Sequence, residues 1–351
     1  GFTKEEDTLD GWFDSGSTHF ASMKKDQGFW PATMYLEGLD QYRGWFQSSL
    51  LTAVGAFGQG APFKECVTHG WTVDGEGKAM HKSLGNGVDP ADVFNENGAD
   101  ILRLWAASAD YHADVRCSKE IFKQLSQNYL KFRNTCKFML DNLVDFDPEK
   151  LTKSEDMPVL DRWLLTKLNE LIEKAEQSYC DYEFHIITHA VNDFCVNTLS
   201  SFYLDIVKDR LYCEGAESAT RRSAQTALYL TLHTLAKLFA PILAFTCDEI
   251  WLAMPHTGED DARNVVLNEM NKPFTAYALD SETMARWERI IEVRTVVNGA
   301  LEEARAAKVI GKSLEADVHL TVPESDRFFA DENPEALADI FIVSKVELAV
   351  G

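Results

Sequence analysis

The apolar positions in the second half of the chain repeat with the period of a helix. One face of a single helix is formed by Leu160, Trp163, Leu164, Leu168, Leu171, Ile172 and Ala175. Another stripe is formed by Leu228, Leu232, Leu235, Phe239 and Ile242. With further helical patterns at roughly 120–143, 182–210 and 218–254, these stripes predict an antiparallel helical bundle.

The first 125 residues show a different pattern, in which short apolar segments alternate with glycine-rich turns. Residues 34–36 predict a short strand, and the β-branched and aromatic content of residues 65–73 predicts a buried one. Residues 9–17 predict a strand that ends in a loop, with Trp12 and Phe13 at its rim. This part of the chain is therefore expected to be α/β and the bundle all-α.

After a connection of low periodicity at residues 255–285, the pattern becomes regular again. A last helix is predicted for residues 282–308, followed by strands at 313–322 and 341–350. These elements predict the beginning of a small α/β unit.

The net charge of the chain indicates which kinds of binding partner are favoured. The chain has 351 residues and a net charge of −22, a field that disfavours the approach of a polyanion. A nucleic-acid function would therefore need a locally basic face on an acidic body. The basic residues that cluster locally either lie on solvated faces of helices or contact phosphate groups. They are Lys131, Arg133, Lys137, Lys208, Arg210, Arg221 and Arg222.

The spacing of the cysteines and the hydropathy of the chain argue against several further classes of protein. The seven cysteines are scattered without a C-x-x-C pair, which argues against a disulfide framework and against a zinc site. His185, His189 and His233 are interpreted as packing residues rather than metal ligands. No apolar run approaches the roughly 20 residues that span a bilayer, and no signal-peptide layout begins the chain. We expect a cytoplasmic protein that does not associate with membranes.

The stretch from Val73 to Pro90 carries the strongest candidate chemistry. It holds several glycines together with Lys78 and Lys82, and it ends in Asp89-Pro90, a typical helix start. A lysine-bearing glycine loop beside a strand end either cradles phosphates or is a solvated connection.

A second candidate site follows the strand at residues 34–36. Glu37, Asp40 and Gln41 lie where that strand gives way to a helix, which is where open α/β sheets bind ligands. They could bind a ligand amine or ribose hydroxyls. The alternative is that they cap the helix, since Asp is common near a helix start.

Four stretches considered together indicate a family. In chain order they are Trp12-Phe13-Asp14-Ser15-Gly16, the block from Tyr35 to Phe46, His69-Gly70, and Ala79-Met80-His81-Lys82-Ser83-Leu84-Gly85-Asn86. With them the chain resembles a class I aminoacyl-tRNA synthetase, specifically of the isoleucyl type. The last stretch resembles the KMSKS element of the family. The block from Tyr35 to Phe46 favours isoleucine over the related valyl and leucyl enzymes.

The resemblance implies a division of the chain. Residues 1–90 would be the C-terminal half of a Rossmann-like nucleotide-binding domain, and residues 91–150 a helical junction. Residues 151–300 would form the anticodon-binding helical bundle, and residues 301–351 the start of the small α/β unit. It also implies a monomer that uses isoleucine, ATP with Mg²⁺, and tRNA(Ile), with no metal site in this part.

The resemblance further implies roles for individual residues. Glu37 would contact the ammonium end of isoleucyl-adenylate, with Gly38, Asp40 and Gln41 lining the same pocket. Trp12 and Trp45 would be walls of the apolar side-chain pocket. The ATP-phosphate loop would consist of Ala79, Met80, His81, Lys82 and Ser83, with Lys82 as the catalytic charge that neutralises phosphates as pyrophosphate leaves.

The chain departs from the family pattern in several places. Ala79 replaces the first lysine of the loop and His81 its serine, and Lys78 could partly substitute for the missing charge. The residues contain no His-x-Gly-His pattern, the HIGH motif, and resemble neither the inserted editing domain nor the C-terminal zinc segment. We therefore expect this chain alone to be inactive in adenylate formation. A non-catalytic tRNA-binding module and a valyl- or leucyl-type ligase are the alternatives.

Overall fold

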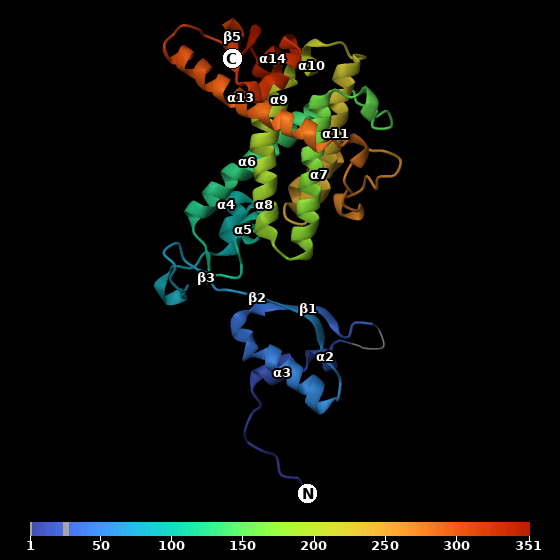
Figure 1. The fold of residues 1–351 in the computed structure, drawn as a ribbon. Coiled ribbons are helices and arrows are strands. Elements are labelled where there is room, and N and C mark those ends of the chain that lie inside the picture. The colour runs from blue at the N-terminus through green and yellow to red at the C-terminus, as the bar shows by residue number, and fades with distance from the viewer. Residues whose placement is uncertain (1, 24–27) are drawn as a thin grey trace. The chain divides into compact units, whose positions relative to one another are not determined.

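The computed structural model describes residues 2–23 and 28–351, and the side chain of Lys82 lies outside that description. The described chain forms two compact units (Figure 1). Unit 1 comprises Gly1–Gly98 and Ala109–Lys123, and unit 2 comprises Ala99–Ser108 and Gln124–Gly351. Within the described ranges, no helix is long and apolar enough to cross a membrane.

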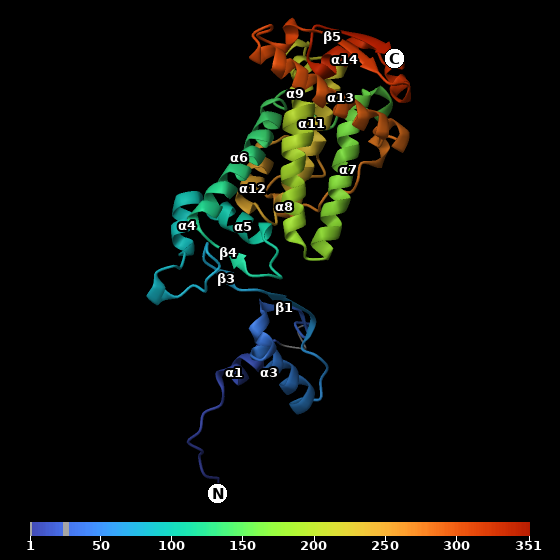
Figure 2. The same ribbon diagram turned by 60° about the vertical axis from the view of Figure 1, so that its left-hand side comes forward.

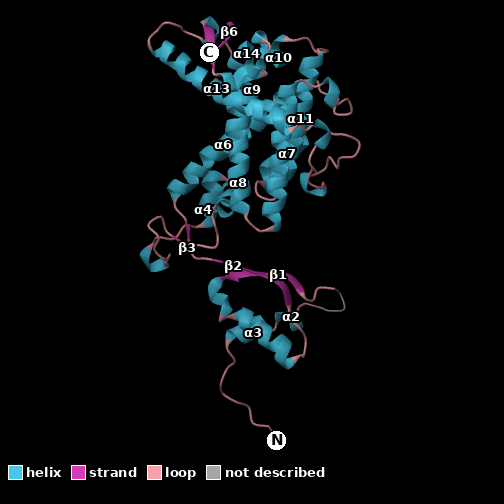
Figure 3. Ribbon diagram, viewed as in Figure 1, coloured by secondary structure: helices cyan, strands magenta, loops and turns pink. Residues whose placement is uncertain are grey.

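Unit 1 is built on two parallel strands (Figure 3). β1 (Ala32–Gly38) and β2 (Phe63–His69) pair from Ala32 opposite Phe63 to Gly38 opposite His69. Because the strands are parallel, their carboxyl ends lie at the same edge. The connection between them contains a 3-10 helix (Leu39–Tyr42), α3 (Trp45–Leu51) and a π-helical turn (Thr52–Ala56).

The strand predicted at residues 9–17 is wrong, because this segment is helical. α1 (Gly11–Gly16) begins where the Asp10 carboxylate accepts a hydrogen bond from the Trp12 backbone N–H at 2.8 Å. α2 (Thr18–Ala21) follows directly. Gly16 allows α1 to lie close to α3, since a Cβ there would lie 2.5 Å from Ser48 Cβ.

The strand predicted at residues 65–73 is two strands, and β2 is half-exposed rather than buried. After His69 the chain bends at Gly70, whose N–H donates to the Tyr111 carbonyl at 2.8 Å. A Cβ at Gly70 would lie 2.5 Å from the Ala113 carbonyl oxygen, so the close approach requires glycine. β3 (Thr72–Val73) then pairs in parallel with β4 (Val115–Arg116).

Unit 2 is mostly helical, and its long helices lie side by side (Figure 2). α7 packs against α8 and α11, and α11 packs against α12, so the predicted bundle is confirmed. The helices up to α13 are α5 (Ala99–Ser108), α6 (Lys119–Asp141, of which residues 119–123 belong to unit 1), α7 (Val159–Cys180), α8 (Phe184–Asp193), a π-helix (Phe194–Tyr203), α9 (Leu204–Ile206), α10 (Lys208–Cys213), α11 (Ala219–Phe239), α12 (Ala244–Ala253) and α13 (Ser281–Ala306).

The two apolar stripes read from the sequence are the core of this bundle. Every stripe residue on α7 is at most 5 % exposed, and those from Leu228 to Ile242 are equally buried. Ile242 lies beyond the end of α11, because Pro241 cannot continue a helix.

A carboxylate is fully buried among these apolar side chains. Asp161 on α7 accepts hydrogen bonds from Tyr203 Oη at 2.8 Å, Arg210 Nη1 at 3.1 Å and Ser223 Oγ at 2.5 Å. Burial raises the pKa of the Asp161 carboxyl, and the charge of Arg210 opposes this shift. The network joins α7 to the π-helix, α10 and α11.

The strands predicted at residues 313–322 and 341–350 are present but shorter than predicted, because residues 313–315 form a 3-10 helix and residue 341 ends a helix. β5 (Asp317–Val322) and β6 (Lys345–Val350) are parallel and are connected through α14 (Pro334–Phe341). Phe341 thus belongs to a helix, which Asn333 caps by accepting from the Glu335 N–H. The helix ends at Ile342, where φ is 55°.

The irregular connection before α13 is held to α7 and α11 by buried polar groups. Arg162 donates to the carbonyls of Tyr277 and Ala278 at 3.2 and 2.8 Å. His233 Nε2 lies 3.0 Å from Asp260 Oδ1, and its Nδ1 lies 2.9 Å from Asn271 Nδ2. Polar side chains therefore compensate for the low hydrophobic periodicity of this segment.

We expect the free energy of unfolding to fall as the pH is lowered through about 6.5, in part because of His233. Burial holds the pKa of His233 below its ordinary value of 6.5, although Asp260 opposes the shift. Below that pH the unfolded chain binds a proton that the folded chain does not, so stability is lost. Lys237 and His256 also face this site and disfavour the imidazolium. The measurement is urea unfolding between pH 7 and 5.

The variant His233→Gln should flatten this part of the pH profile. Exposed His319, which lies 2.9 Å from Glu347, provides the control, and His319→Gln should keep the slope. Parallel profiles for the wild type and His233→Gln would contradict the expectation.

The seven cysteines separate into two classes. Four are buried, namely Cys117, Cys136, Cys195 and Cys247, and three are exposed, namely Cys66, Cys180 and Cys213. Burial raises the pKa of Cys195 to about 12, so this thiol stays protonated at neutral pH. The buried thiols are packing residues.

Candidate functional site

The carboxyl ends of β1 and β2 bring a carboxylate and an imidazole together. Glu37 Oε1 lies 3.9 Å from His69 Nε2, and both side chains are about half exposed. His69 itself is oriented by a 2.8 Å contact between its Nδ1 and the Gly70 carbonyl. An accessible carboxylate at this edge can receive a cationic ligand group.

The 3-10 helix after β1 places Asp40 and Gln41 beside Glu37 in the sequence but gives them different environments. Gln41 is buried; its Oε1 accepts from the Trp45 N–H and its Nε2 donates to Asp40 Oδ2, both at 3.2 Å. Gln41, three residues before the N-cap residue Gly44, thus caps the first free N–H of α3 with its side chain. Asp40 is exposed, and its Oδ1 would lie 2.6 Å from a Cβ at Gly38. The glycine leaves room for that carboxylate.

The two tryptophans differ in exposure. Trp45 is half-buried at the start of α3. The centroid of its ring lies 4.6 Å from that of Tyr35 and 4.7 Å from that of Phe46. Trp12 lies on α1 and is 45 % exposed. The structure therefore gives Trp45 an aromatic packing role, and Trp12 an open indole face.

The loop between β3 and α4 (Pro90–Asn97) is exposed along most of its length. The Asp74 carboxylate closes its first turn by accepting from the N–H groups of Glu76 and Lys78 at 3.0 and 2.8 Å. A hydrogen bond from Asn86, with these two backbone bonds, holds the pKa of the Asp74 carboxyl below its usual value. Lys78 Nζ pairs with Glu76 at 2.7 Å, and both are more than two-thirds exposed.

The end of this loop is folded as the sequence predicts. Lys82–Leu84 form a 3-10 helix, which carries Ser83, and α4 starts after Asp89, whose carboxylate accepts from the Ala91 N–H at 2.8 Å. Ala79 is bridged to Val73, and Met80 is half-buried next to exposed His81. The side chain of Lys82, the predicted catalytic charge, lies outside the described residues.

Two families match separate parts of the chain. The family described as "tRNA synthetases class I (I, L, M and V)" matches residues 1–118, and "Anticodon-binding domain of tRNA ligase" matches residues 161–320. Both lie in the order that the sequence resemblance predicts. The chain belongs to the class I tRNA synthetases.

Curated relatives indicate which type of class I synthetase this chain resembles. Isoleucine--tRNA ligase of Moorella thermoacetica is 51 % identical over 351 residues, covering 99 % of this chain and 37 % of the relative. Isoleucine--tRNA ligase of Caldicellulosiruptor saccharolyticus is 47 % identical over 352 residues, covering 100 % of this chain and 38 % of the relative. The chain thus spans somewhat more than a third of the length of these relatives, and its resemblance to the isoleucyl type is confirmed.

Solved structures confirm the synthetase fold. A LeuRS of Agrobacterium radiobacter K84, in a ternary complex with tRNA and LeuAMS, matches 79 % of this chain and 34 % of its own, at 18 % identity and a TM-score of 0.62. The methionyl-tRNA synthetase of Mycobacterium tuberculosis, in complex with methionyl-adenylate, matches 67 % of this chain and 47 % of its own, at 20 % identity and a TM-score of 0.53. The α/β region followed by a helical bundle is therefore a class I synthetase arrangement.

Six of the seven local cations named from the sequence pair with carboxylates of the chain itself. Arg221 Nη1 lies 2.7 Å from Asp145, and Arg222 Nη1 donates to the Asp145 carbonyl at 2.7 Å. Hydrogen bonding to Arg221 lowers the pKa of Asp145 to about 2. Four more cations of this group form ion pairs: Arg133 with Glu249, Lys137 with Asp141, Lys208 with Asp205 and Arg210 with Asp161. These contacts agree better with the interpretation that the basic residues lie on helix faces than with the interpretation that they contact phosphate groups.

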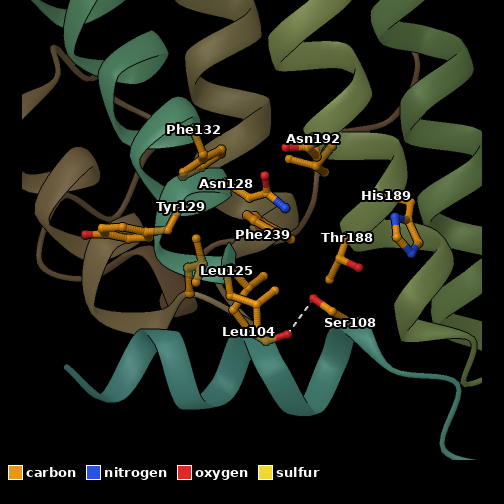
Figure 4. Close-up of a pocket in the computed structure, with 12 residues that line it drawn as sticks. Leu104, Ser108, Leu125, Asn128, Tyr129, Phe132, Thr188, His189, Asn192 and Phe239 are labelled. Atoms are coloured by element: carbon orange, nitrogen blue, oxygen red, sulfur yellow. Dashed lines mark hydrogen bonds between the residues drawn. The ribbon is translucent and has the colours of Figure 1, made fainter. Parts of the chain in front are cut away.

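A pocket at one end of unit 2 is unsuited to a nucleotide (Figure 4). It lies among α5, α6 and α8, has a volume of about 80 Å³, and is lined by Leu104, Asn128, Thr188, His189 and other residues. Ligand pockets of drug size occupy roughly 300–1,000 Å³. Among the described residues, no group of three or more His, Cys, Asp or Glu side chains is arranged to hold a metal ion.

Sequence reasoning passed over the residues that fix the synthetase loop. Asp74 and Asn86 make most of its side-chain contacts, yet neither was among the predicted site residues. The available signal was their position, since each lies next to a glycine at a turn.

Proposed function

We propose that the protein containing this chain is an isoleucine–tRNA ligase, which activates isoleucine with ATP and transfers it to tRNA(Ile). The observation that carries the proposal is the near-complete match of this chain to isoleucine–tRNA ligases, at 51 % and 49 % identity over 99 % of its length. The accessible carboxylate at the β1–β2 edge supports it.

The reaction has two steps. The isoleucine carboxylate attacks the α-phosphorus of ATP, which enters as its magnesium complex; the bond to pyrophosphate breaks and isoleucyl-adenylate forms. A ribose hydroxyl of tRNA then attacks the adenylate carbonyl carbon, and AMP leaves. Neither step needs a covalent bond to the protein, so the residues act by positioning and by charge.

Glu37 binds the ammonium group of isoleucine in this proposal. Its carboxylate is half exposed at the strand edge, and opposite charge on the ligand is the natural complement. Gly38 and Asp40 line the same pocket, where the missing Cβ makes room for the Asp40 carboxylate. Gln41 supports the pocket indirectly, by capping α3.

The apolar part of isoleucine lies against the tryptophans. Trp12 offers an exposed indole face, whereas Trp45 is braced by Tyr35 and Phe46. A rigid aromatic wall of this kind suits a branched aliphatic side chain.

The loop of Ala79, Met80, His81, Lys82 and Ser83 meets the ATP phosphates. Lys82 supplies the charge that stabilises the departing pyrophosphate. Lys78 is a weaker source of charge, because its ammonium already pairs with Glu76. Ala79 and His81 belong to the same loop, and Ser83 lies in the first turn of the 3-10 helix.

The bundle contributes tRNA recognition, consistent with the match of residues 161–320 to an anticodon-binding domain. Because most of its local cations are paired and the chain carries −22 charges, binding by this chain alone should be weak and strongly salt-dependent. A tRNA-binding module without catalysis is the competing function.

Isoleucine-dependent ATP–pyrophosphate exchange tests the proposal. The full-length protein should exchange pyrophosphate at lower concentrations of isoleucine than of valine or leucine, and this 351-residue chain alone should not. Exchange that prefers valine or leucine would replace the assignment with another ligase of the class. A full-length protein that binds tRNA(Ile) in a filter assay but never exchanges pyrophosphate would establish the binding module instead.

A further inference from the structure

One side chain, Asn86, reaches back across the loop that carries Lys82. Its carboxamide oxygen accepts from the His81 N–H at 2.9 Å, and its Nδ2 donates to the Ala79 carbonyl at 3.1 Å. These two backbone groups flank Met80, so the amide bonds to the segment as a neighbouring strand would. The residues immediately before Lys82 are therefore held by a residue that follows it.

The same amide connects this segment to the beginning of the loop. Asn86 Nδ2 also lies 2.8 Å from Asp74 Oδ2, while Asp74 Oδ1 holds the turn at Glu76 and Lys78. A carboxylate acceptor makes a stronger hydrogen bond than a neutral one. Asp74 and Asn86 thus form a clamp, the Asp74–Asn86 clamp, that joins both ends of the loop to its middle.

The other restraints on the loop are mainly backbone bonds: the Asp74 N–H donates to the Lys78 carbonyl at 2.9 Å, and Val73 is bridged to Ala79. Residues 75–79, 81 and 83–85 are exposed, so apolar packing contributes little to its conformation. Gly77 and Gly85 have φ values of 85° and 61°, and glycine loses more conformational freedom on ordering than any other residue. Hydrogen bonds to the clamp, together with these backbone bonds, compensate for this loss.

We propose that the Asp74–Asn86 clamp positions Lys82 for adenylate formation. The inference rests on the proposed function, because it assigns a task within that reaction. Asn86 is a positioning residue: it acts on the backbone of Ala79–His81 and through it on Lys82, and it need not touch ATP. Losing the clamp lowers the fraction of loop conformations in which the ammonium meets the phosphates, so the loss falls on kcat.

The test uses the full-length protein and isoleucine-dependent pyrophosphate exchange. Asn86→Ala should lower kcat by about 10- to 100-fold with the KM for isoleucine unchanged, because the clamp lies in the phosphate loop. Asn95→Ala is the matched control, an exposed asparagine on α4, and should behave as the wild type. Amide hydrogen exchange of residues 79–83 should accelerate in Asn86→Ala only.

A swap of the two side chains tests whether they act as a pair. Asn86→Asp places two carboxylates together and should be at least as slow as Asn86→Ala, and Asp74→Asn should also be slow. The double variant, Asp74→Asn with Asn86→Asp, can remake the 74–86 hydrogen bond with the donor reversed and should recover part of kcat. Recovery of this kind is not expected if each residue acts independently of the other.

The outcomes distinguish this inference from the function on which it rests. If the wild-type protein exchanges pyrophosphate with isoleucine and Asn86→Ala matches it in kcat, the clamp has no positioning role while the function stands. A double variant no better than the slower single variant would also overturn it. If the wild type shows no exchange, the proposed function fails, and the inference with it.

Discussion

Replacing Lys82 with alanine in the full-length protein is expected to lower kcat/KM for isoleucine-dependent pyrophosphate exchange by about 10²- to 10³-fold. The proposed charge acts on the phosphates as negative charge moves to the leaving pyrophosphate, and alanine removes it without altering the amino-acid pocket. Steady-state exchange kinetics over a range of ATP and isoleucine concentrations measure the effect. The KM for isoleucine should change little.

Lys78→Ala is the matched control for this experiment. Lys78 lies in the same loop, but its ammonium pairs with Glu76 at 2.7 Å in an exposed position. Its removal should cost much less than that of Lys82. An equal loss of kcat/KM in both variants would show that the loop acts through its total charge. A loss confined to Lys78→Ala would show that Lys78, and not Lys82, stabilises the leaving pyrophosphate.

Replacing Asp161 with alanine is expected to lower the free energy of unfolding of the 351-residue chain by about 3–5 kcal/mol. The carboxylate is fully buried and satisfies Tyr203, Arg210 and Ser223 together. Its loss leaves a guanidinium without its partner in the bundle, along with two unsatisfied hydroxyl groups and a small cavity. Urea unfolding followed by helical circular dichroism at neutral pH measures the change.

Asp141→Ala provides the comparison on the surface of the same bundle. Asp141 pairs with Lys137 four residues earlier at 2.6 Å, and both side chains are more than half exposed. Exposed pairs of this type contribute roughly 0.3–0.5 kcal/mol. A loss for Asp161→Ala no larger than that for Asp141→Ala would mean that the buried network does not stabilise the bundle.

The helices of the bundle could be predicted because their information is local. On α7 and α11 the residues of the two apolar stripes recur at helical spacing, and these stripe residues are buried in the structure. The buried network around Asp161 could not be predicted in the same way. Its four members come from α7, the π-helix, α10 and α11, and only the packed bundle brings them together.

The errors at both ends of the chain have a common cause. Residues 9–17 and 341–350 contain short apolar runs that suit a strand as well as a helix, and periodicity cannot separate the two at this length. Caps decide the outcome. Asp10 starts α1, and Asn333 starts α14, which then ends in a left-handed residue at Ile342.

The sequence predicted which segments form the candidate site, but it could not assign a structural task to each residue within them. Asp40 and Gln41 are adjacent and both suit a cap or a ligand contact. The structure gives the cap to Gln41, because its amide oxygen reaches the Trp45 N–H while the Asp40 carboxylate remains exposed. Asn86 was missed because its partners lie five, seven and twelve positions earlier.

The distribution of thiols makes the chain suitable for site-directed labelling without a cysteine-free background. The buried thiols of Cys117, Cys136, Cys195 and Cys247 are shielded from reagents in the folded state. Of the accessible ones, Cys66 lies on β2 in unit 1, three residues before His69, whereas Cys180 and Cys213 lie in unit 2. Replacing Cys213 by serine would leave one accessible thiol in each unit. A donor–acceptor dye pair on Cys66 and Cys180 would then report the distance between the strand edge and the bundle in solution.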